Sequence, residues 1–178
     1  MSSPLEPLLR ALFEGGAGEP LPPGAPPGGA PPGPLSSHPG EDRFLPLLTL
    51  ESGQRIGLTA AAAWVAVPAE GPPRVFTADE AHAFYEVLES KRSEVEDRLE
   101  EAARAAGLPP DDVVLAFPAA AVVRAVLGKN LPYMTRLALL WLRATELREL
   151  RADIVAVSRS PGMPVPIKDL AERLIVPE

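Results

Sequence analysis

The chain has no cysteine and only two histidines among its 178 residues. Without cysteine there can be no disulfide bond, thiolate metal site or cysteine nucleophile, and such a composition suits a reducing compartment such as the cytoplasm. His38 lies in a Pro/Gly-rich stretch that gives an imidazole no fixed geometry, which leaves His82 as the only candidate for histidine-dependent chemistry.

Long apolar runs are also missing. The longest spans twelve residues, 56–67, whereas a bilayer-crossing helix needs roughly twenty. The first residues, Met1-Ser2-Ser3-Pro4, are followed closely by Glu6 and lack the basic and apolar regions of a signal peptide. We therefore expect a cytoplasmic protein with no membrane association.

Motifs for phosphate binding and nucleophilic catalysis are absent as well. Gly128-Lys129 is followed by Asn130 instead of Ser or Thr, and it lacks the upstream glycine of a phosphate-binding loop. There is no Gly-x-Ser-x-Gly sequence of the kind that presents a nucleophilic serine. We expect no catalytic residue and no cofactor.

One pattern suggests a metal. Asp79, His82 and Glu86 follow one another at helical spacing, and a facing helix that carries Glu146 and Glu149 could complete a ligand set. The alternative is that these are solvated residues of a first helical turn, where the helix dipole favours acids. We favour this alternative, so a metal-dependent enzyme is the least favoured function.

Proline and glycine, in contrast, are abundant, with 23 and 14 residues. Seventeen of the twenty-six residues from 15 to 40 are one or the other. Such a segment cannot bury enough apolar surface to offset the entropy lost on ordering. We predict three parts: a short amphipathic helix over 1–14, a disordered Pro/Gly-rich linker over 15–42, and a single globular helix-rich domain over 43–178.

The first part carries a regular apolar stripe. Five large apolar side chains recur at the spacing of one helix face, and they are Leu5, Leu8, Leu9, Leu12 and Phe13. A helix of about ten residues is unstable alone in water, so this face needs a surface to pack on. That surface could belong to another protein or to the chain's own domain. The first forty residues resemble, in architecture alone, the docking peptides that recruit cargo to bacterial protein compartments.

The predicted domain is α+β and helix-rich. Residues 44–58 read as a β-hairpin that turns at Gly53, and 64–67 and 74–76 could add two strands to a small meander. The alanine run 60–63 is the exception, because alanine favours helix. Two long helices, over 77–106 and from Pro132 to about residue 157, predict a long antiparallel helical hairpin. Shorter helices are expected over 118–127 and 167–174.

Charge is distributed unevenly along these predicted helices. Residues 77–112 carry eleven acids and four bases, whereas residues 124–151 carry six bases and two acids. The flanking charges could pair within the chain. Alternatively, an arginine-rich face could bind an acidic partner, and its members would be Arg136, Arg143, Arg148 and Arg151. The net charge of −7 makes nucleic acid an unfavoured partner.

These observations favour a non-enzymatic adaptor or regulatory subunit that binds one or more proteins. The tethered N-terminal helix would make one contact and the helical domain a second, and the linker would raise the effective concentration of each. The alternative is a structural subunit of a larger assembly, or a homo-oligomer, in which the long helices of two chains complete a bundle.

Overall fold

The computed structural model describes residues 3–22 and 43–175, and the described chain divides into two compact units. Unit 1 comprises the described residues up to Ala83 together with Ser93–Phe117, and unit 2 comprises Phe84–Arg92 and the described residues from Pro118 onward. These boundaries differ from the predicted ones, 1–14, 15–42 and 43–178. None of the described helices combines the length and apolarity that crossing a bilayer would require.

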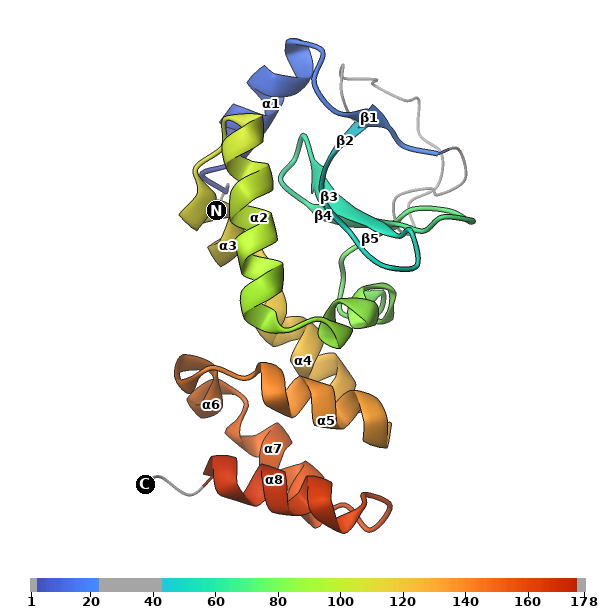
Figure 1. Ribbon diagram of the computed structural model, residues 1–178, viewed down its shortest axis with the longest axis vertical. Helices are drawn as coiled ribbons and strands as arrows, with labels where there is room; N and C mark the ends of the chain where they lie inside the picture. Colours follow the sequence, from blue (N-terminus) through green and yellow to red (C-terminus); the bar gives the residue numbers. More distant parts are fainter. Residues whose placement is uncertain (1–2, 23–42, 176–178) are drawn as a thin grey trace. The chain divides into compact units, whose positions relative to one another are not determined.

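A five-stranded antiparallel sheet forms the centre of unit 1, with its strands ordered as they occur in the chain (Figure 1). The strands are β1 (Glu19–Pro20), β2 (Arg43–Thr49), β3 (Arg55–Thr59), β4 (Trp64–Val67) and β5 (Arg74–Val75). The predicted meander is confirmed. The alanine run forms the β3–β4 turn instead of a helix, with Ala62 at a φ of 57° and the Thr59 hydroxyl accepting the Ala63 amide at 3.2 Å.

One glycine of the sheet is needed for close packing. Gly57 on β3 lies opposite Pro46 on β2, where the register shifts between Pro46 and Leu48. A Cβ on Gly57 would lie only 2.0 Å from the Leu45 carbonyl oxygen. Any side chain at this position would therefore force the two strands apart.

Unit 1 also contains three helices, which are α1 (Glu6–Glu14), the part of α2 (Arg92–Ala106) from Ser93 onward, and α3 (Pro110–Ala116). Val95, Leu99 and Ala103 are buried on α2 at four-residue spacing. The Trp64 indole N–H donates to the Ala116 carbonyl at 2.7 Å. This bond ties the end of α3 to β4.

The described part of the predicted linker, residues 15–22, is ordered. Glu19 pairs with Phe44 across the β1–β2 ladder, and the Arg43 guanidinium donates to the Gly16 and Gly18 carbonyls at 3.0 and 2.7 Å. The prediction of disorder was wrong for residues 15–22. It was based on composition alone, whereas these bonds are made with β2, which lies far along the chain. The remaining linker residues, 23–42, lie outside the described residues.

Unit 2 is helical. Its elements are the part of the 3₁₀ helix η1 (Ala81–Glu89) from Phe84 onward, then α4 (Ala119–Leu127), α5 (Pro132–Trp141), α6 (Ala144–Glu149), α7 (Arg151–Arg159) and α8 (Val165–Ile175). The predicted helices over 118–127 and 167–174 are confirmed as α4 and α8. Residues 154–157 belong to α7.

The two predicted long helices are both interrupted, so the helical hairpin is not confirmed. The Thr77 hydroxyl accepts the Glu80 amide at 3.2 Å, but the turns that follow are 3₁₀ and α2 begins only at Arg92. The second helix ends at Trp141, because Leu142 adopts extended backbone with a ψ of 135°. Periodicity alone did not reveal these breaks, since the apolar spacing continues across them.

A buried and an exposed leucine on α1 provide a matched test of this packing. Leu9 is fully buried in unit 1 and Leu8 is 41% exposed. We expect Leu9→Ala to lower the free energy of unfolding by about 2–5 kcal/mol, because it leaves a cavity, and Leu8→Ala to change it by about 0.5 kcal/mol or less. Urea denaturation of the full chain measures both. Equal effects of the two substitutions would contradict the packing of α1.

Candidate functional site

The N-terminal stripe is divided by burial. Leu5 and Leu9 are fully buried and Phe13 is 5% exposed, whereas Leu8 is 41% exposed and Leu12 is half-buried. Three of the five side chains predicted to bind a partner therefore pack within unit 1. Only the edge of the stripe is open on the folded unit.

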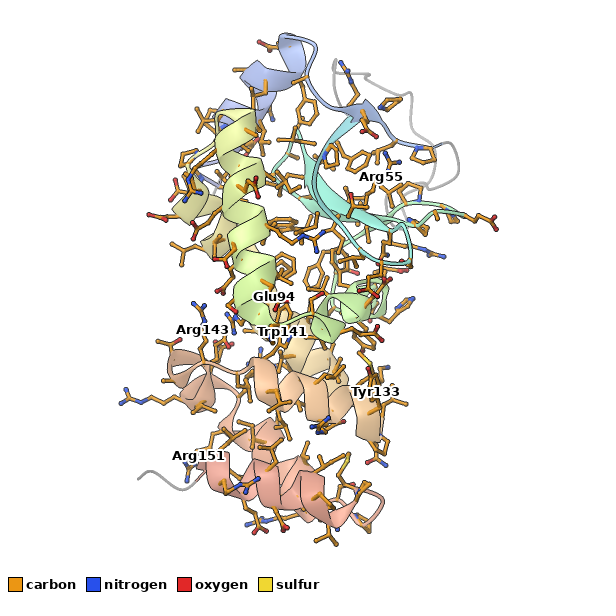
Figure 2. The ribbon with its side chains drawn as sticks, in the orientation of Figure 1. Arg55, Glu94, Tyr133, Trp141, Arg143 and Arg151 are labelled. Carbon is orange, nitrogen blue, oxygen red and sulfur yellow. The ribbon has the colours of Figure 1, made fainter. Side chains whose placement is uncertain are left out.

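The four predicted arginines lie on different helices. Arg136 is on α5, Arg148 is on α6 and Arg151 begins α7, while Arg143 precedes α6. In Figure 2, Arg143 and Arg151 lie on the side of unit 2 near α6, away from Tyr133 at the far end of α5. The Arg151 guanidinium donates to the Ile175 carbonyl at 3.0 Å. The breaks after α5 and α6 turn the predicted single arginine face into separate positions.

Pairing within unit 2 involves only some of its cations. Arg124 pairs with Glu149 at 2.9 Å and with Asp153 at 3.5 Å. Arg136 and Arg148 form no ion pair with any described residue. The described part of unit 2 holds eleven Lys and Arg against seven Asp and Glu, a balance of +4. A positive surface therefore remains after internal pairing.

The outward face of α5, which we define as Tyr133, Arg136, Leu137 and Leu140, carries exposed apolar side chains. Tyr133 is 60% exposed and Leu140 is 58% exposed, and Leu137 is half-buried between them. Positions separated by three, four and seven residues lie on one side of a helix. The opposite side of α5 is buried and carries Thr135, Ala138, Leu139 and Trp141.

An ion pair holds the C-terminal end of α5 in place. The Arg92 guanidinium donates to both carboxylate oxygens of Glu146, at 2.6 and 2.8 Å, and to the Trp141 carbonyl at 2.7 Å. The two side chains are 15% and 14% exposed. The Trp141 indole N–H donates to the Ser90 carbonyl at 2.9 Å. These bonds satisfy backbone groups that the break after Trp141 would otherwise leave unpaired.

The same contacts control the ionisation of Glu146. Burial alone would raise the pKa of its carboxyl, but the hydrogen bond from Arg92, the Arg143 backbone amide at 3.1 Å and the charges of both arginines outweigh burial. The pKa of Glu146 is therefore held below its usual value of 4.5. The carboxylate stays charged at neutral pH.

The N-terminal end of α5 is held by a loop contact. Asn130 has a φ of 53°, a conformation in which asparagine is favoured, and its side-chain oxygen accepts the Ser160 hydroxyl at 3.1 Å. A Cβ on Gly162 would lie 2.9 Å from the Asn130 side-chain nitrogen. Both ends of α5 are thus fixed, and the side opposite its outward face is buried.

The predicted metal pattern gains no support. His82 is 61% exposed, and its Nδ1 lies 3.2 Å from the backbone oxygen of Asp79. Within residues 3–22 and 43–175, no three His, Asp or Glu side chains are grouped so that they could hold a metal ion.

A shallow hollow lies between α7 and α8. It is lined by Val155, Ser158, Arg159, Glu172 and Ile175. The Ser158 hydroxyl donates to the Val155 carbonyl of its own helix at 3.0 Å. No histidine is among these lining residues, so the hollow lacks the serine–histidine pair of a typical nucleophilic site.

Comparison of the chain with protein-family models, with curated protein sequences and with solved structures finds no match. The sequence prediction gave the binding role on this helix to its arginines and did not single out the apolar side chains of Leu137 and Leu140. The available signal was that α5 is apolar around most of its circumference, more than one buried face requires.

The ion pair predicts an acid-dependent stability. Because the folded pKa of Glu146 is lowered, its contribution is complete above pH 4.5 and is lost as the pH falls through the folded pKa. We expect Glu146→Gln to cost roughly 3–5 kcal/mol at pH 7, since it leaves Arg92 without its charge partner, and to flatten the acid limb of the stability curve.

Glu149 is the matched control, because it is 58% exposed and also pairs with an arginine. Glu149→Gln should cost about 1 kcal/mol or less. Urea unfolding measured from pH 7 down to about pH 3, below the usual carboxylate values, separates the two variants. Equal losses would show that the Arg92–Glu146 pair has no special role.

Proposed function

We propose that this chain is a non-enzymatic adaptor or regulatory subunit that binds another protein through the outward face of α5. The observation that carries the proposal is the exposure of Tyr133 and Leu140 on a helix held at both ends. A cysteine-free sequence suits a reducing compartment, and we propose the cytoplasm as its location.

The arrangement of exposed apolar side chains supports binding. The described part of unit 2 has four large exposed hydrophobic residues, and three of them lie within ten positions, at Leu131, Tyr133 and Leu140. Single exposed apolar side chains are ordinary, but a group on one helix face is typical of a contact surface. Burying each fully would contribute roughly 1.5–3 kcal/mol, which is enough for a specific contact when several act together.

The position of α1 limits how the N-terminal stripe could contribute. A partner that uses all five of its apolar side chains would have to release Leu5, Leu9 and Phe13 from unit 1. Leu8 and Leu12 could join a contact without that release. We therefore propose α5 as the main surface and the open edge of α1 as a secondary one.

A structural subunit of a homo-oligomer remains the second proposal, since the same face of α5 could pack on another copy of the chain. A hydrophobic helix face is suited to either role. In the adaptor proposal Leu140 contacts a different protein in the cell, and in the second proposal it contacts another copy of this chain.

Photo-crosslinking at single positions tests the proposal. A benzophenone amino acid placed at Tyr133 or Leu140 of the full chain, in its native cell, should capture one common protein that mass spectrometry identifies. Leu115 on α3 is the control, because it is 82% exposed in unit 1. Capture of a second copy of the chain would favour the structural subunit. No adduct at positions 133 and 140, or the same adducts at 115, would refute α5 as the contact surface.

A further inference from the structure

We infer that the outward face of α5 recognises an acidic amphipathic helix of its partner, an inference that rests on the proposed function. The face combines a central apolar stripe with cations whose charge is not neutralised within the described chain. The apolar stripe indicates the apolar spacing of the partner helix, and the cations indicate its charge.

The apolar stripe selects the shape of the partner. Tyr133 and Leu140 are seven residues apart, which places them about 10.5 Å apart along the helix axis. Leu137 lies between them and is half-buried. A partner helix with apolar residues at i, i+3 or i+4, and i+7 has the matching length and spacing.

The cations select the charge of the partner. Arg136 lies beside the stripe, and Lys129, also exposed, precedes α5. Neither forms an ion pair with a described residue. Together with the +4 balance of unit 2, they favour a partner helix that carries acids beside its apolar stripe. The charges would set orientation and association rate more than affinity.

Nucleic acid is a poorer match to this face. The cations are few, and the apolar Leu137 and Leu140 lie on the same face of α5 as Arg136. The whole chain carries a net charge of −7, which repels polyanions at long range. A second copy of the chain is an alternative that the experiment must distinguish. The described part of unit 1 carries fourteen acids against six bases, so another copy could also offer an acidic surface.

Binding of designed peptides to the full chain tests the inference. The probe is a fluorescein-labelled helical peptide with Leu at i, i+3, i+4 and i+7 flanked by Glu, compared with versions in which Gln or Lys replaces every Glu. Fluorescence anisotropy should rank the affinities Glu, then Gln, then Lys. Raising the salt from about 50 to about 300 mM should weaken only the Glu version, because added salt screens exposed charges.

Two pairs of variants locate the contact. Arg136→Glu should weaken the Glu peptide about tenfold, whereas Arg173→Glu on α8, which changes the net charge equally, should weaken it about twofold or less. Leu140→Ser should remove binding, and Leu115→Ser in unit 1 should leave it unchanged. All four positions are exposed, so the fold should tolerate each substitution.

The outcomes separate the inference from the proposed function. Equal binding of the Glu and Lys peptides, no binding of any peptide, or equal effects of Arg136→Glu and Arg173→Glu would overturn the acidic-helix inference. So would competition by a single-stranded RNA oligonucleotide, or concentration-dependent dimerisation that Leu140→Ser abolishes. If a foreign protein still crosslinks at Leu140 in any of these cases, the adaptor proposal stands and only the chemistry of its partner changes.

Discussion

The ion pair between Arg92 and Glu146 is the interaction on which the organisation of unit 2 depends. It joins residues 54 positions apart in the chain and also satisfies the Trp141 carbonyl at the point where α5 ends. A partly buried arginine with two carboxylate bonds stabilises only while both partners are present, because either one left alone would be a desolvated charge. The break after α5 is therefore stabilised by a contact from outside its own helix.

The position of that break decides what α5 can present. A helix running on from Pro132 to residue 157 would have placed the four predicted arginines along one face. The turn after Trp141 instead separates them, and Arg136 stays alone beside Tyr133 and Leu140. The result is an apolar surface with a cation at its side, which matches a protein partner better than a polyanion.

The N-terminal helix shows why an amphipathic pattern does not reveal its own partner. The spacing of Leu5, Leu9 and Phe13 predicts that this face is buried, and it is. The pattern is the same whether the covering surface is foreign or belongs to the chain, because burial of apolar area is not directional. The decision came from Arg43 and the other strands and helices of unit 1, which lie far from α1 in sequence.

Local signals in the sequence determined the meander of β2 to β5, the helices α4 and α8, and the cap at Thr77, because turn residues, caps and alternation act over a few positions. Only the tertiary structure decided where the long helical patterns break, which apolar face of α5 is exposed, and that residues 15–22 are ordered. Each of these depends on a hydrogen bond or a buried contact between residues distant in the chain, which periodicity within one segment cannot report. The open face of α5, on which the proposed function rests, is a product of those distant contacts.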